Sequence, residues 1–358
     1  MSERQTARIK KMMKSIHEIK NSRVLYITTK NTDYLRVTQE VRLLQEAGNT
    51  VTLIGSSEKS YRKRLCTVYR ALLSVRMEDY DISMVGFAPQ LVLPLFGRKL
   101  QKKPLVIDFF ISFYDTLCMD RKKFRPQSIP GKMLHRLDRR TLQRADLAIC
   151  DTHAHGQYFC EEFSYPSAQM QTLYLEADTS IYYPRPMQPH TDFTVLYFGS
   201  ILPLQGVPVI LEAISLLEQE PHLHMIMVGP LGDGAVLRNF GGMSAVRITD
   251  QYCPEPTPTY IDCLPQQQLA ERIAQADLCL AGHFDGTIQK ARRTIPGKAY
   301  IYHAMQKPMI LGDNPATHEL YQASEDGIYF VEMGNARALA DLILQIKHQK
   351  EQQNEKSG

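Results

Sequence analysis

The amino-acid sequence predicts an α/β fold of two Rossmann-like, doubly wound domains that face across a cleft. At 358 residues the chain is too long for one ordinary hydrophobic core. Apolar strand-like runs alternate with helix-like patterns from Val24 onward, which favours parallel sheets covered by helices. Residues 184–191 contain three prolines and read as a linker between the two halves. We expect a basic N-terminal segment (1–22), two domains (23–185 and 186–334) and a C-terminal helix with a polar tail (335–358).

The first half opens with one βαβ unit, because Gly48 ends a helical pattern that lies between two apolar runs. Further short apolar runs then follow at intervals that leave room for helices between them. The predicted helices cover residues 36–47 and 130–144, and the predicted strands cover residues 24–27, 51–54, 82–85, 105–107 and 147–150.

The alternation restarts after the linker. Neither half has GxGxxG after its first strand, which argues against a dinucleotide-dependent dehydrogenase. Residues 349–358 are polar, and we expect them to fray. The predicted helices cover residues 207–218, 267–276, 298–305 and 335–348, and the predicted strands cover residues 194–198, 224–228, 278–281 and 309–311.

Composition and charge bound the class of protein. The chain is 44% hydrophobic and 22% charged, which is typical of soluble globular proteins. Its start lacks the apolar run of a signal peptide, and its longest apolar run contains two prolines, so we expect a cytoplasmic protein without a membrane span. Residues 1–190 hold 30 Lys and Arg against 19 Asp and Glu, whereas residues 191–358 hold 12 against 19. The first half therefore suits an anionic partner such as a membrane surface, unless the charge is only a solvated face.

Neither a metal nor a cofactor is expected. The seven cysteines form no CxxC pair and no zinc-like spacing, so we expect reduced, buried thiols. The stretch from Asp151 to His155 (Asp-Thr-His-Ala-His) could suggest a metal site, but Asp and Thr after a strand are typical of a helix N-cap. The basic clusters come with no recognised nucleic-acid module, so we expect no nucleic-acid partner.

Four cations gather before and at a predicted helix start: Lys290, Arg292, Arg293 and Lys298. The start of a helix carries partial positive charge, so a cation there is locally unfavourable. An anion bound between the cations and the helix start would make both interactions favourable, and helix starts bind phosphate readily. The alternative is that these side chains point into solvent.

Several stretches in the second half occur in an order that resembles retaining group 1 (family 4) glycosyltransferases of the GT-B fold. These are residues 178–184, 195–207, 225–229 and 264–280, followed by the helix at Lys298 and the Lys307-Pro308 strand. The resemblance is strong over residues 177–332 and thinner over residues 23–176. It implies an acceptor-binding first domain, a second domain that binds a nucleotide-sugar, and sugar transfer with retention and without an obligatory metal.

The sequence departs from this family at the donor phosphates. Many members place Arg and Lys at the positions of Ser200 and Gln205, which are uncharged here, and paired glutamates at the positions of Arg293 and Ile301. We expect Lys298 with Arg292 or Arg293 to replace the missing cations, since charge-assisted contacts hold phosphate well. The resemblance, together with this relocation of charge, gives these candidate donor-binding residues: Gly199, Ser200, Gln205, Gly206, Gly229, Leu264, Arg292, Arg293 and Lys298.

In the first domain, Asp108 and Asp115 both follow the strand predicted at residues 105–107. They are the candidates for accepting or orienting the proton of the acceptor hydroxyl. Each could equally bond loop N–H groups. The glycine-rich loop that this family often has after its first strand is absent at residues 28–33. Separately, the basic clusters of this domain suggest peripheral attachment to a membrane.

The sequence thus favours a retaining glycosyltransferase that moves a sugar from a UDP- or GDP-sugar to a glycan or a lipid-linked acceptor, in bacterial cell-surface polysaccharide synthesis. The alternative is a catalytically silent GT-B protein that binds glycan or partners an active transferase, because the expected acids and cations are missing from their usual positions.

Overall fold

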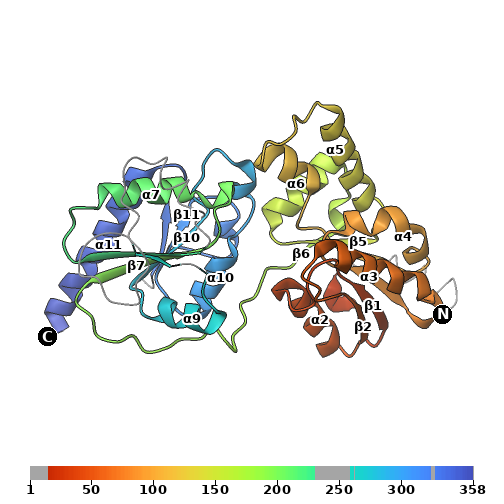
Figure 1. Ribbon diagram of the computed structural model, residues 1–358, viewed down its shortest axis with the longest axis horizontal. Coiled ribbons are helices and arrows are strands. Elements are labelled where there is room, and N and C mark those ends of the chain that lie inside the picture. The colour runs from red at the N-terminus through yellow and green to blue at the C-terminus, as the bar shows by residue number, and fades with distance from the viewer. Residues whose placement is uncertain (1–14, 230–258, 262, 324–326, 358) are drawn as a thin grey trace. The chain divides into compact units, whose positions relative to one another are not determined.

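The computed structural model describes residues 15–229, 259–261, 263–323 and 327–357. The chain forms two compact units, Met1–Glu176 and Ala177–Gly358, each built on one parallel sheet (Figure 1). The sequence places the boundary slightly later, within the proline-rich stretch at residues 184–191. In the part of the chain that the structure describes, no helix combines the length and apolar character needed to cross a bilayer.

The first unit has a six-stranded sheet in the order β2-β1-β3-β4-β5-β6. Helices α3, α4, α5 and α6 pack on one face, where Leu25, Ile107 and Phe159 lie in one core cluster. Helix α2 covers the other face, where Val37 packs with Tyr26. The elements are β1 Arg23–Ile27, α2 Leu35–Glu46, β2 Thr50–Ile54, α3 Tyr61–Ser74, β3 Ile82–Val85, α4 Leu93–Leu100, β4 Leu105–Asp108, α5 Ile129–Leu142, β5 Leu147–Cys150, α6 His153–Phe163 and β6 Met170–Thr172.

The second unit has a six-stranded sheet in the order β12-β11-β10-β7-β8-β9. Helices α7 and α11 share one core cluster with the inward residues of β7 and β10, such as Val195 and Leu280. Figure 1 shows α9 on the opposite side of this sheet. The elements are β7 Phe193–Phe198, α7 Val207–Leu216, β8 Leu223–Val228, β9 Thr259–Ile261, α9 Gln266–Ala274, β10 Leu278–Gly282, α10 Gly297–Ala304, β11 Met309–Gly312, β12 Ile328–Val331 and α11 Ala336–Ser357.

The predicted α/β class and the doubly wound halves are confirmed, and the helices and strands expected from the periodicity are present. Two expectations are wrong. The polar tail does not fray at residue 349, because α11 continues to Ser357. Its continuation contains no Gly or Pro, and it is anchored by a buried Lys347 that bonds Glu351 one turn later. Two of the described cysteines, Cys66 and Cys263, are exposed rather than buried, although all the described cysteines are free thiols.

Candidate functional site

The carboxyl ends of β7 and β10 form the natural ligand site of the second unit. From β7 the chain adds β8 and β9 on one side of the sheet and then returns to β10, β11 and β12 on the other. Ligands of open parallel sheets bind where the strand order reverses in this way. The loops that leave β7 and β10 lie at this edge, and so does the start of α10 with Lys298.

Lys298 is a buried cation at this edge, with only 5% of its surface exposed. Its ammonium donates a hydrogen bond to Gln205 Oε1 and lies 4.7 Å from the centroid of the Tyr197 ring. A Cβ on Gly199 would stand 3.4 Å from Lys298 Nζ, so the ammonium also lies against the backbone that follows β7. No carboxylate of the described residues forms an ion pair with it. Among the described residues, the contacts of the Lys298 ammonium are therefore with neutral groups.

Burial lowers the pKa of Lys298 to about 7, because its charge is removed from water without an anion nearby. His283, which follows β10, is also buried, and burial together with the Lys298 charge lowers its pKa to about 3. The imidazole therefore stays neutral at physiological pH. An anion bound beside Lys298 would relieve the cost of its burial and favour the charged ammonium.

The start of α7 supplies a second feature that attracts anions. Gly206 precedes this helix with φ of 69°, and a Cβ there would stand 2.6 Å from Phe284 C and from Asp285 N. Only glycine fits this left-handed turn against the loop that follows β10. No side chain caps α7, and Pro208 lies in its first turn. Pro208 has no N–H and the Val209 N–H already bonds the Gly206 carbonyl, so the start of this ten-residue helix attracts an anion mainly through its dipole.

The structure brings four of the predicted donor-binding residues together: Gly199, Gln205, Gly206 and Lys298. Gly229, which follows β8, adjoins them, because a Cβ there would stand 2.1 Å from the Gly199 carbonyl oxygen. Ser200 and Arg292 are exposed, and Leu264 and Arg293 are half-buried. The donor-binding roles of all nine residues stay predictions.

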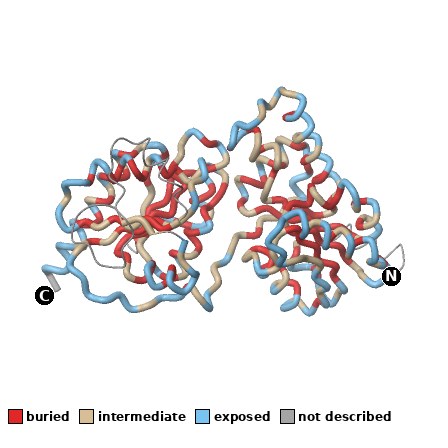
Figure 2. Tube along the Cα trace, in the orientation of Figure 1, coloured by how far each residue is buried: buried red, intermediate tan, exposed pale blue. Residues whose placement is uncertain are grey.

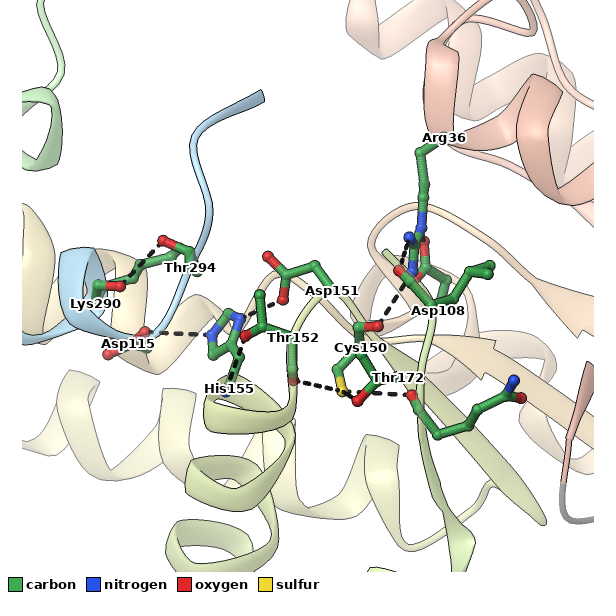
Figure 3. A network of polar contacts seen from close by, with 12 residues as sticks. Arg36, Asp108, Asp115, Cys150, Asp151, Thr152, His155, Thr172, Lys290 and Thr294 are labelled. Atoms are coloured by element: carbon green, nitrogen blue, oxygen red, sulfur yellow. Dashed lines mark hydrogen bonds and ion pairs between the residues drawn. The ribbon is translucent and has the colours of Figure 1, made fainter. Parts of the chain in front are cut away.

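In the first unit, Asp108 ends β4 and is almost fully buried. Arg36 Nε and one terminal nitrogen donate to its two carboxylate oxygens, each at 3.1 Å (Figure 3). The same guanidinium lies 3.3 Å from Glu40 and donates to the Leu173 and Cys150 carbonyls. Arg36 thus joins α2 to Asp108 at the end of β4 and to the chain that follows β5 and β6, and the predicted part of Asp108 in proton transfer stays a prediction.

Two carboxylates share this one guanidinium in a dry interior. Burial raises the pKa of Glu40 well above its usual range, and the nearby Asp108 charge raises it further. The Tyr26 hydroxyl bonds the same Glu40 carboxyl. The surroundings thus favour the protonated form of Glu40 more than its charged form, whereas Asp108 forms the two-pronged ion pair with Arg36.

Asp115 belongs to a second buried group in the same unit (Figure 3). One of its carboxylate oxygens lies 3.9 Å from His155 Nε2, and His155 Nδ1 lies 2.7 Å from Asp151 Oδ1. Burial alone would raise the pKa of Asp151, but His155 bonds its carboxylate and lowers the pKa overall. The three side chains form an Asp-His-Asp line that orients the imidazole between two acids.

The predicted N-cap is confirmed, since the Thr152 hydroxyl accepts the His155 N–H at the start of α6. Among the described residues, no group of three or more His, Cys, Asp or Glu gathers as a metal site would require.

Sequence reasoning missed four partners of these sites: Arg36, Tyr197, His155 and His283. Most of these side chains meet their partners only through the fold, as Arg36 meets Asp108 across 72 residues of sequence. A partial signal existed for His155, because it lies four residues after Asp151 in a predicted helix and so on the same helix face.

Residues 192–349 match the family model described as glycosyl transferases group 1. This part of the second unit is a group 1 glycosyltransferase domain. No curated protein matches the chain. The resemblance of the second half to group 1 glycosyltransferases is thereby confirmed over these residues, whereas the assignment to family 4 and sugar transfer with retention stay predictions.

Solved structures show that the whole chain has the GT-B fold. The HepE protein of Anabaena in complex with UDP has a TM-score of 0.61 at 13% identity, over 92% of this chain and 90% of that chain. The sucrose-phosphate synthase of Thermosynechococcus elongatus also has a TM-score of 0.61 at 13% identity, over 91% and 90%. An alpha-glucosyltransferase in complex with UDP-glucose and DNA containing an abasic site has a TM-score of 0.59 at 12% identity, over 91% and 90%.

Proposed function

We propose that this chain is a retaining glycosyltransferase that binds the diphosphate of a UDP- or GDP-sugar beside Lys298 and the start of α7. The observation that carries this proposal is a buried lysine ammonium, with no carboxylate partner among the described residues, at the ligand edge of a group 1 glycosyltransferase domain. The similar HepE protein is described in complex with UDP-glucose, which supports a UDP-sugar as donor.

The charge of the donor site has been relocated rather than lost. Gln205 lies at the position where many family members carry a cation. Its amide oxygen accepts a hydrogen bond from the Lys298 ammonium. A lysine from α10 therefore places its positive charge near the position that the family fills from the α7 side. Arg292 and Arg293 precede the same helix and are the further candidates for the diphosphate.

The arrangement suits the departure of an anionic leaving group. As the sugar leaves, negative charge develops on the diphosphate, and a preorganised ammonium with the dipole of α7 stabilises it. Transfer in this proposal needs neither a metal nor a cofactor. The acceptor hydroxyl loses its proton to the leaving phosphate or to a carboxylate of the first unit, for which Asp108 and Asp115 are the candidates.

The acceptor in this proposal is a glycan or a lipid-linked saccharide, and the enzyme works in the cytoplasm on a bacterial cell-surface polysaccharide. The anionic partner suggested by the basic first half is the membrane that would carry such an acceptor.

Steady-state kinetics with the native donor test the site. Lys298→Ala should lower kcat/KM about ten- to hundredfold, since one charge-assisted contact is worth about 1.5–3 kcal/mol. Arg292→Ala should lower it by a similar factor if its guanidinium contacts the diphosphate. Lys307→Ala is the matched control, because Lys307 is also a largely buried lysine of this unit but bonds the Ala274 carbonyl. Unchanged kcat/KM in both Lys298→Ala and Arg292→Ala would contradict the relocation.

The silent alternative is favoured by the uncharged Ser200 and Gln205. Release of nucleoside diphosphate from UDP- or GDP-sugars in the presence of acceptor extract separates the two. Release that depends on Lys298 supports the transferase. If the chain binds nucleotide but releases no nucleoside diphosphate from any of the donor sugars, the silent alternative is supported instead.

A further inference from the structure

The first unit carries a strongly cationic surface on α5 and on the loop before it, which we call the basic face. Its one acidic residue, Asp138, points inward, is fully buried and accepts hydrogen bonds from Gln90 and Ser112. Every Lys and Arg of residues 121–140 is exposed: Arg121, Lys122, Lys123, Arg125, Lys132, Arg136, Arg139 and Arg140 (Figure 2). The outward charge of this segment is therefore entirely positive.

The loop and the helix form one continuous surface. A Cβ on Gly131 would stand 2.4 Å from the Arg125 carbonyl oxygen and 2.6 Å from the Pro126 carbonyl oxygen, so the loop backbone presses onto the first turn of α5. Ser128 caps the helix by accepting the Gly131 N–H, and its own N–H and hydroxyl donate to the Arg125 carbonyl. The loop cations are thereby fixed beside the helix cations.

Two apolar side chains stand in the middle of this charge. Ile129 is 77% exposed and Met133 is 67% exposed, and they lie one turn apart at the start of α5. Because residues three and four apart share a helix face, Lys132, Arg136 and Arg140 lie on the same side as these two. The outer face of α5 is thus an apolar tip flanked by cations.

We propose that the basic face docks the first unit on an anionic lipid bilayer, with Ile129 and Met133 inserted among the head groups. Cations alone would fit any polyanion, but exposed aliphatic side chains gain only where an apolar phase receives them. A protein surface that binds nucleic acid would instead present aromatic or hydrogen-bonding side chains to the bases. The proposal deepens the proposed function by placing the chain on the surface that would carry a lipid-linked acceptor, but the docking itself does not require transferase activity.

Co-sedimentation of the full chain with vesicles of phosphatidylcholine containing about 25% phosphatidylglycerol tests the docking. Wild type should bind these vesicles and lose binding in high salt, since polybasic attraction is screened. Pure phosphatidylcholine vesicles should bind at least about tenfold less protein. Equal binding to both kinds of vesicle, or to neither, would overturn the proposal.

Two variants, each with a matched control, test whether vesicle binding depends on the basic face in particular or on the positive charge of the whole unit. Arg136→Gln with Arg139→Gln and Arg140→Gln should weaken vesicle binding about hundredfold, since each cation near such a surface contributes about sixfold. The control removes three exposed cations of α3 through Arg62→Gln, Lys63→Gln and Arg70→Gln. An equal loss in the control would overturn the assignment to α5.

The second pair tests the apolar tip. Ile129→Gln with Met133→Gln should weaken vesicle binding at least about tenfold without changing the net charge. Leu73→Gln with Leu95→Gln is the control, because these leucines of α3 and α4 are 71% and 68% exposed. No effect of the Ile129 and Met133 changes would contradict insertion and leave only a polyanion surface.

Two further readouts complete the test. Binding of a mixed-sequence DNA duplex by the full chain should be weaker than vesicle binding and insensitive to the Ile129 and Met133 changes; tighter, tip-dependent DNA binding would overturn the lipid assignment. Binding of UDP or GDP by the same variants should match wild type, because the variants lie in the first unit. A wild-type chain that binds nucleotide but does not dock on the vesicles would therefore count against the docking proposal alone. A wild-type chain that docks but binds no nucleotide would count against the proposed function alone.

Discussion

Each unit buries a cation near the carboxyl edge of its sheet, and the two cations have opposite surroundings. Arg36 of the first unit is 3% exposed and forms a two-pronged ion pair with Asp108 beside Glu40. Lys298 of the second unit is 5% exposed and has a neutral amide, an aromatic ring and glycine backbone as neighbours. Burial is similar, but among the described residues only the Arg36 charge has a carboxylate partner.

The difference separates a structural charge from a charge that awaits a ligand. A buried ion pair satisfies itself, and removing one partner leaves the other charge stranded. A buried ammonium without an anion destabilises the fold, so its retention indicates that an anion binds there at some stage of function. The predictions that follow either sharpen this contrast or break it.

The largest expected effect is the loss of the Arg36 pair. Arg36→Met should lower the free energy of unfolding by about 3–5 kcal/mol, because Asp108 is left buried without its cation. Arg42→Met is the control, since Arg42 pairs with Glu176 at the surface of the same unit with both side chains about half exposed, where such pairs contribute about 1 kcal/mol or less. Urea denaturation measures both; similar losses would show that burial of the pair does not matter.

A somewhat smaller effect is expected from Gly206→Ala. A left-handed φ costs alanine about 1–2 kcal/mol, and the Cβ would also meet the backbone of Phe284 and Asp285. Gly334→Ala is the control, because φ there is 84° but the nearest atom to a Cβ would be 3.7 Å away. Thermal unfolding should show a larger loss for Gly206→Ala, together with weaker nucleotide binding, and equal losses would remove the argument for the close α7 turn.

The uncompensated charge predicts a rise of stability with pH. The pKa of Lys298 is about 7 in the folded chain against an ordinary value of 10.5, so the unfolded chain binds more protons between these values. Unfolding free energy should therefore increase from pH 7 towards pH 10 by on the order of 2 kcal/mol more in wild type than in Lys298→Met. Urea titrations at several pH values measure this, and parallel curves for the two proteins would contradict the low pKa.

The smallest effect concerns nucleotide affinity. A bound diphosphate favours protonated Lys298, so binding takes up a proton above the pKa of the free site. The affinity of wild type for UDP or GDP should be full below pH 7 and fall at most about tenfold for each pH unit above it. Calorimetry in buffers of different ionisation enthalpy would show the proton uptake, and a flat profile that Lys298→Met shares would count against a phosphate contact.

Much of the fold could be predicted from the sequence, because local sequence patterns indicate where strands and helices begin and end. The apolar runs at β1 and β7, Gly48 after α2 and Gly206 before α7 each mark an element or its end. The helix α11 ran longer than its apolar pattern indicated, since its last turns are held by polar and charged side chains such as Lys347 with Glu351. Such support is visible only when the partners are placed.

The candidate site could be predicted in part. The cations before α10 and the glycine turn before α7 are local features, so Lys298 and Gly206 were found from the sequence. The amide oxygen of Gln205 that accepts the Lys298 ammonium, and the Tyr197 ring beneath it, depend on parallel pairing of distant segments. Asp108 was predicted from the sequence to follow a strand, but its burial and its ion pair with Arg36, 72 residues away, depend on the fold.

Thermal unfolding of Lys298→Met with and without UDP or GDP tests the central claim most directly. Without nucleotide the variant should unfold at a higher temperature than wild type, because the buried charge is gone. With nucleotide, wild type should gain stability in proportion to binding, and the variant should gain far less. A variant that is less stable than wild type on its own, or that gains as much from nucleotide, would contradict the claim that Lys298 is an uncompensated charge which the donor diphosphate completes.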